Sequence, residues 1–141
     1  WYSLVFPNLD LDGFKTGIPD RQENKLYQDY VSAVEAAVGS VHAAGVAHLD
    51  LYPSNVFHRV RNGSVEVKII DWDGSHLLGE SFCGQHRRIN SGTVITAAHD
   101  TFYIDALKKR GTEDIWKRLE VGNSKAEMDT AFFELLEMED Q

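Results

Sequence analysis

The sequence predicts a mainly helical α+β domain with one or two small antiparallel hairpins. Apolar residues recur at helical spacing over residues 21–44, and further helical patterns fill residues 100–138. Between them, two short β-branched runs flank the pair Asn62-Gly63, a strong signal for a tight hairpin. With 141 residues, 43% of them hydrophobic, the chain is expected to form one domain over residues 1–141.

Composition excludes several classes of function. A net charge of −8 argues against a nucleic-acid surface, because phosphate backbones are held by Lys and Arg patches. No apolar run approaches the roughly 20 residues that cross a bilayer, so we expect no membrane segment. Cys83 is the single cysteine, which rules out an intrachain disulfide and favours a reducing compartment, cytoplasmic or nuclear. The first residue is Trp1 rather than Met, so we expect the chain to be a piece of something longer.

The N-terminal third is predicted to contain a strand, a loop and a long helix. Residues 1–6 are aromatic and β-branched and precede Pro7, which indicates a short buried strand. Residues 8–20 have the Gly, Pro and Asp content of a loop. The helix over residues 21–44 can end at Gly45. Its apolar stripe is Leu26, Tyr30, Val31, Val34, Val38 and Val41.

The middle of the chain is predicted as loop, hairpin and loop. Residues 48–55 are too polar and too short for a buried element and contain Pro53. Strands are expected over residues 56–60 and 65–70, with residues 71–74 following at once. Residues 79–92 have the composition of a polar loop. The predicted C-terminal helices cover residues 100–109, 112–121 and 124–138.

The candidate chemistry lies in the two loops that flank the hairpin. The first offers His48, Asp50 and Asn55, and the second offers Asp71 and Asp73. Because the base of the hairpin brings both loops side by side, Asp50, Asn55 and Asp71 should surround one cleft. Phosphoryl transfer needs a carboxylate beside the acceptor hydroxyl and hard oxygen ligands for Mg²⁺. Asp73 is either a second metal ligand or a polar turn residue, and we favour the turn.

Residues 48–55 (HLDLYPSN) resemble the catalytic loop of protein-kinase-like enzymes, H-x-D-L-x-x-x-N, and residues 67–73 (VKIIDWD) resemble the strand that leads into D-F-G. The resemblance implies that the chain is the C-terminal lobe of a kinase-like fold. It implies Asp50 as catalytic base, His48 as a brace, Asn55 and Asp71 as metal ligands, and ATP with Mg²⁺ as cofactors.

Weaker similarities extend to either side of these motifs. Residues 4–9 are similar to the last small-lobe strand and the hinge, so that Pro7 and Leu9 would face the adenine and Phe6 would guard the back pocket. Residues 92–100 resemble the end of an activation segment. Asp100 would then hold the catalytic loop from below, or cap the helix that follows.

The sequence also departs from the kinase pattern. Leu49 replaces the Arg of H-R-D, which puts control by loop phosphorylation in doubt, and Tyr52 replaces the loop Lys or Arg. Trp72-Asp73 is closer to small-molecule kinases such as the aminoglycoside and choline kinases. The 141 residues contain no Gly-rich loop, strand lysine or paired glutamate for the triphosphate. We therefore expect the N-terminal lobe to be absent, and ATP binding and activity to be weak.

The sequence is compatible with three functions. The first is an ATP-dependent phosphotransferase acting on a hydroxyl, with this chain as its large lobe. The second is a pseudokinase or scaffold lobe that binds an N-lobe or a protein partner, or a second copy, through the hinge face. The third is a small-molecule kinase. His58, His76, His86 and His99 lack metal-ligand spacing and are read as surface or loop residues.

Overall fold

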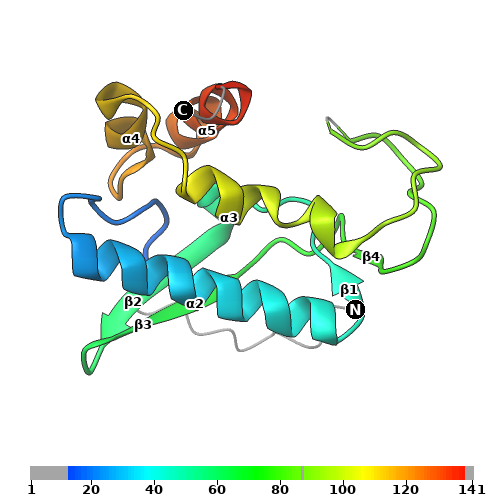
Figure 1. Cartoon of the computed structure of the whole chain (residues 1–141), viewed down its shortest axis with the longest axis horizontal. Helices are drawn as coiled ribbons and strands as arrows, with labels where there is room; N and C mark the ends of the chain where they lie inside the picture. Colours follow the sequence, from blue (N-terminus) through cyan, green and yellow to red (C-terminus); the bar gives the residue numbers. More distant parts are fainter. Residues whose placement is uncertain (1–12, 87, 139–141) are drawn as a thin grey trace.

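Within the described residues, the domain is built on one long helix that crosses a β-hairpin, with one short helix beside the long helix and two more grouped to one side (Figure 1). It is described by a computed structural model that covers residues 13–86 and 88–138. The predicted α+β class with small antiparallel pairs is confirmed. The strand and hinge predicted for residues 1–9 lie outside the described residues.

Helix α2 (Asn24–Ala43) corresponds to the helix predicted over residues 21–44. It begins later because Asp20 starts a turn, in which its side chain and carbonyl accept the N–H groups of Gln22 and Glu23. Leu26 and Val41 of the predicted stripe are only half-buried. The buried face is Tyr27, Tyr30, Val31, Val34 and Val38. No helix in the described part of the chain is long and apolar enough to span a membrane.

The predicted hairpin is present as β2 (Val56–Arg61) and β3 (Ser64–Ile69). Asn62 and Gly63 have φ angles of 53° and 76°, the left-handed conformations that a two-residue turn requires. The register pairs Val56 with Ile69 and His58 with Val67 on the face that α2 covers. Phe57 pairs with Lys68, and alternation places both on the opposite face.

A second antiparallel pair joins β1 (Val46–Ala47) to β4 (His76–Leu77). Beyond β4, residues 79–86 and 88–96 form a loop, which lies at the right in Figure 1. The prediction of a simply polar loop is wrong, because Phe82 and Ile89 are buried. With the side chains of Ala47, Leu49 and Ile95 they make a second, smaller core. The loop is therefore packed against the segment that precedes Asp50.

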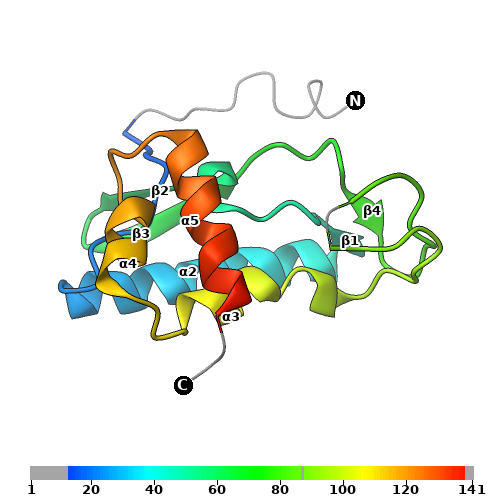
Figure 2. The ribbon, with the colours of Figure 1, turned by 90° about the horizontal axis from the view of Figure 1, so that it is seen from above.

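The C-terminal helices α3 (Phe102–Leu107), α4 (Glu113–Leu119) and α5 (Lys125–Glu137) complete the main core (Figure 2). Thr112 and Ser124 cap α4 and α5 by accepting backbone N–H groups. Helix α3 is shorter than the predicted 100–109, because a 3-10 turn (Ala97–His99) precedes it and the Asp100 side chain is bound elsewhere.

Candidate functional site

The start of the candidate catalytic loop is fixed by one buried carboxylate. Asp100 is 0% exposed and accepts the backbone N–H groups of His48 and Leu49, each at 2.7 Å. His42 at the end of α2 places its Nε2 2.9 Å from the same carboxylate. Asp100 therefore braces the loop, as the resemblance implied. It does not cap α3, whose N-cap position is Thr101.

His48 joins the two loops that carry the candidate residues. Its Nδ1 accepts the N–H of Asp50 at 3.1 Å, so the ring proton lies on Nε2, which donates to the carbonyl of Ile70 at 2.8 Å. The ring packs edge-on against Trp72, with centroids 4.7 Å apart. His48 thus sets the spacing between the backbone at Asp50 and the backbone that leads into Asp71.

Asn55 ties the same two loops at a second point. It ends a 3-10 turn (Pro53–Asn55) and is 6% exposed. Its side-chain amide donates to the carbonyl of Asp50 at 2.9 Å, and its own carbonyl accepts the N–H of Ile70 at 2.9 Å. Since the amide nitrogen is engaged, Oδ1 is the atom of this side chain that can face a cation.

The carboxylates of Asp50 and Asp71 are both open to solvent. The Asp50 side chain is 36% exposed, and Asp71 is exposed with a left-handed φ of 63°. Gly74 lies against Asp50, since a Cβ at position 74 would come within 2.9 Å of Asp50 Oδ2. The absence of a side chain at position 74 therefore leaves room for the carboxylate.

A cleft of about 420 Å³ opens beside Asp50. Its walls include the aromatic side chains of Tyr52, Phe82 and Phe133, together with Asp73 and His86. An apolar wall next to a carboxylate is suited to an organic molecule that offers a hydroxyl group to Asp50.

The donor set fits Mg²⁺ as part of a shared coordination shell. Asn55 and Asp71 offer the carbonyl and carboxylate oxygens that this cation prefers. No group of three or more His, Cys, Asp or Glu within the described ranges could hold a metal ion by itself. A cation here would need further oxygens from water and from substrate phosphates, as is usual for Mg²⁺ in kinases.

Of the histidines predicted as surface or loop residues, His58 is instead buried in strand β2, whereas His86 lies in a loop but contacts the catalytic loop. His58 is 7% exposed in the core, edge-on to Tyr30 at 5.0 Å, and its Nδ1 is buried without a partner in the described structure. Burial, helped by the charge of Lys15, lowers the pKa of His58 to about 4. His86 donates from Nε2 to the carbonyl of Leu49 at 2.7 Å. Its sequence position, in a loop 37 residues away, gave no signal of this contact.

The structure brings His48, Asp50, Asn55 and the backbone before Asp71 into one hydrogen-bonded unit. The nucleotide-contacting residues expected from the sequence, Phe6, Pro7 and Leu9, lie outside the described residues.

Comparison with protein-family models gives one match, to the lipopolysaccharide kinase (Kdo/WaaP) family, over residues 7–79. Comparisons with curated proteins and with solved structures gave no match. The matched region spans just over half of the chain and contains Asp50, Asn55 and Asp71, whereas His86 and Asp100 lie beyond it. The kinase-like resemblance is thereby confirmed, and the chain belongs to the lipopolysaccharide kinase (Kdo/WaaP) family, a protein-kinase-like family of phosphotransferases.

Proposed function

We propose that this chain is the C-terminal lobe of an ATP-dependent kinase that phosphorylates a hydroxyl group. The observation that carries the proposal is the hydrogen-bonded unit of His48, Asp50 and Asn55 with the backbone at Ile70. In this proposal it keeps the solvent-open Asp50 carboxylate close to Asn55 and to the backbone before Asp71, so that Asn55 and Asp71 would supply oxygen ligands from separate loops. Phosphoryl transfer depends mainly on such positioning of charged groups.

In this proposal Asp50 accepts the proton of the acceptor hydroxyl. The hydroxyl oxygen forms a bond to the γ-phosphorus while the bond from that phosphorus to the β–γ bridging oxygen of ATP breaks. Asn55 Oδ1 and the Asp71 carboxylate would hold Mg²⁺, which would supply charge neutralisation at the phosphate oxygens. His48 keeps the two loops at a fixed separation during the reaction.

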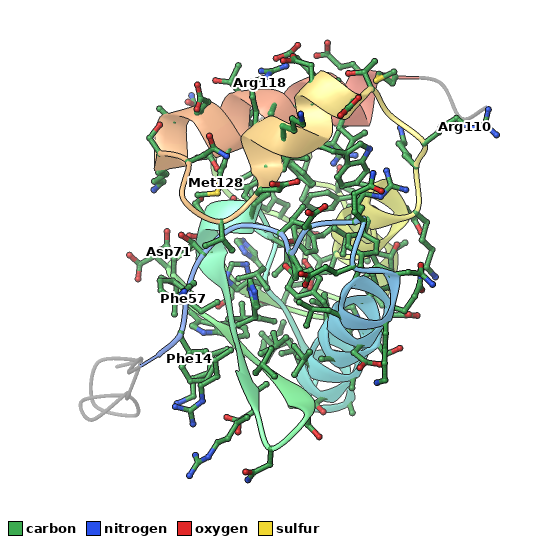
Figure 3. All side chains as sticks on the ribbon, turned by 90° about the vertical axis from the view of Figure 1, so that its left-hand side faces the viewer. Phe14, Phe57, Asp71, Arg110, Arg118 and Met128 are labelled. Carbon is green, nitrogen blue, oxygen red and sulfur yellow. The ribbon has the colours of Figure 1, made fainter. Side chains whose placement is uncertain are left out.

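The two substrates would approach from different sides of this unit. Figure 3 shows Asp71, Phe57 and Phe14 along the side of the hairpin that faces away from α2. Arg59 and Lys68 lie over the Phe14 ring at 4.4 Å and 5.0 Å. Since Phe14 is only 8% exposed beneath these cations and Arg59 also pairs with Glu66 at 3.0 Å, this face offers positive charge to the phosphates of a nucleotide rather than an open ring to its base.

The acceptor would enter the cleft beside Asp50. The family is described by its action on lipopolysaccharide, and the aromatic side chains of Tyr52, Phe82 and Phe133 fit a ring that carries hydroxyl groups. We therefore propose a hydroxyl of a lipopolysaccharide as the acceptor, rather than a protein side chain.

We further propose that these 141 residues turn over slowly by themselves. They contain no Gly-rich phosphate loop, and triphosphate alignment contributes much of the catalysis in this reaction class. The residues that grip the phosphates would come from an N-terminal lobe or a partner at the hinge face. Rapid ATP-dependent phosphorylation by the purified 141-residue chain, abolished in Asp50→Ala, would contradict this part of the proposal.

The metal and nucleotide site can be tested without turnover. We expect Mn²⁺ added with ATP to the ¹⁵N-labelled chain to broaden the amide signals of Asp50, Asn55 and Asp71 selectively. Asp71→Asn should weaken the broadening. Asp105→Asn makes the same chemical change at an exposed residue of α3, and should leave the broadening unchanged. No selective response at millimolar metal with ATP would overturn the kinase proposal and favour a scaffold lobe.

A further inference from the structure

We infer that His86 is a positioning residue, which aims the Asp50 carboxylate by holding the peptide group before it. The inference rests on the proposed function, because it assigns Asp50 the role of proton acceptor. His86 lies outside the region that matches the family model. Its side chain is 9% exposed, and its Nε2 is 2.7 Å from the carbonyl of Leu49 and 3.5 Å from Asp50 Oδ1.

The peptide group between Leu49 and Asp50 is held at both edges by histidines. Its carbonyl oxygen accepts from His86 Nε2 at 2.7 Å, and its N–H donates to His48 Nδ1 at 3.1 Å. A peptide group is planar, so two opposed hydrogen bonds fix its rotation. That rotation sets the direction in which the Asp50 side chain leaves the backbone.

The orientation of the His86 ring is itself fixed. Nδ1 accepts the N–H of Arg88 at 3.0 Å, which leaves the ring proton on Nε2 to donate to Leu49. The ring also lies edge-on to Phe82, with centroids 5.8 Å apart and planes at 86°. These contacts make His86 a rigid donor rather than a mobile loop side chain.

The loop that carries His86 is anchored to the catalytic loop by apolar packing. Leu49 is 0% exposed and packs with Phe82, Ile89 and Ile95 in the second core. Within the loop, backbone bonds join Phe82 to Thr93 and Gly92. In a kinase that has Arg in place of Leu49, the arginine can bind a phosphate group that orders this segment. In this chain Leu49 is buried, and its apolar packing holds the segment instead. The His86 contact therefore forms without any added charge.

The test compares His86→Ala with His86→Gln, because glutamine retains an N–H donor. The matched control is His99→Ala. His99 lies in the segment that follows and bonds Thr96 instead of the catalytic loop. We expect His86→Ala to shift the carbonyl ¹³C signal of Leu49 and the amide signal of Asp50. His86→Gln should restore much of both shifts, and His99→Ala should move neither. A ¹⁵N spectrum of the His86 ring should show the proton on Nε2.

Activity gives the second readout, in a preparation that transfers phosphate from ATP. Misplacing a catalytic group by about 1 Å can cost about a hundredfold in rate. We expect His86→Ala to lower kcat between about tenfold and a hundredfold, with KM for ATP within about twofold and with partial recovery in His86→Gln. Unchanged Leu49 and Asp50 signals, or kinetics equal to those of His99→Ala, would overturn the inference. Shifted signals in a protein that shows no selective broadening at Asp50, Asn55 and Asp71 with Mn²⁺ and ATP would support the contact and overturn the proposed function instead.

Discussion

Replacing Asp100 by Asn should weaken the fold and loosen the catalytic loop together. The side chain accepts three hydrogen bonds, one at Oδ1 from Leu49 N–H and two at Oδ2 from His48 N–H and His42 Nε2. An asparagine has one acceptor oxygen, so its NH₂ group must face at least one of these donors. The less costly rotamer places the NH₂ group against Leu49 N–H.

The magnitude follows from the geometry. An unpaired buried donor costs about 1–3 kcal/mol, and changing two charged hydrogen bonds to neutral ones costs about 1 kcal/mol each. We therefore expect Asp100→Asn to lower the free energy of unfolding by roughly 3–5 kcal/mol. Asp100→Ala removes both acceptor oxygens and with them all three hydrogen bonds, so its expected cost approaches the total stability of a small domain, about 5–15 kcal/mol. The asparagine variant is thus the informative one.

Urea unfolding gives the free energy, and amide hydrogen exchange shows where it is lost. The exchange of Leu49 N–H should accelerate more in Asp100→Asn than that of residues in α5. Asp105→Asn, at an exposed position of α3, serves as the control and should change stability by less than about 0.5 kcal/mol. A loss below about 1 kcal/mol for Asp100→Asn, or protection unchanged at Leu49, would refute the reasoning.

Three further changes follow from single contacts. Gly74→Ala should leave stability within about 0.5 kcal/mol but lower kcat about tenfold or more, because the new Cβ falls 2.9 Å from Asp50 Oδ2 and displaces that carboxylate. The pKa of His58 is about 4 in the folded protein and 6.5 in the unfolded chain. The unfolded chain therefore binds the proton first, and the free energy of unfolding decreases by about 3 kcal/mol as the pH falls from 6.5 to 4. His58→Leu removes the titrating group and should abolish this decrease. Lys109→Met should destabilise by about 1–2 kcal/mol, because Nζ donates to three carbonyls at the end of α5.

Each of these outcomes has a measurement that can contradict it. For Gly74→Ala, steady-state kinetics equal to those of the parent protein would show that Asp50 is not displaced. For His58→Leu, the free energy of unfolding is measured at pH 7 and at pH 4. A decrease between these pH values as large as that of the parent protein would show that His58 is not the titrating group. For Lys109→Met, unchanged stability in urea would mean that water replaces the three contacts without cost.

The sequence predicted those features that depend on neighbours in the chain. The hairpin follows from Asn62-Gly63 between β-branched runs, because a two-residue turn fixes the pairing register. Helices α4 and α5 begin at Thr112 and Ser124, whose side chains supply local capping bonds. The loop–hairpin–loop order then predicted that Asp50 and Asp71 belong to one site, and the bridge through His48 accords with that interpretation.

Contacts made across long stretches of chain were harder to predict. Asp100 lies 51 residues beyond Leu49, and its brace was expected only from the kinase resemblance. His86 was missed, because a histidine in a loop without periodicity carries no indication of its partner. The burial of Phe82 and Ile89 was missed for the same reason. Hydrophobic periodicity identifies helices and strands, but a packed loop has no period to detect.

Backbone strain at the site explains why these distant contacts matter. Leu49 and Asp71 both adopt left-handed φ angles, 73° and 63°, which cost of order 1–3 kcal/mol each for residues with a side chain. They stand directly before the proposed base and at the proposed metal ligand. Such conformations persist only where surrounding bonds hold them.

The structure supplies such bonds to Leu49 itself and to the residue just before Asp71. Leu49 donates to Asp100 and accepts from His86, and Ile70, just before Asp71, donates to Asn55 and accepts from His48. Glycine at position 49 would relieve the strain but would remove a side chain that is 0% exposed and packs in the second core. Leucine at position 49 therefore keeps the strained backbone conformation, but its buried side chain attaches the loop that carries His86 to the catalytic loop.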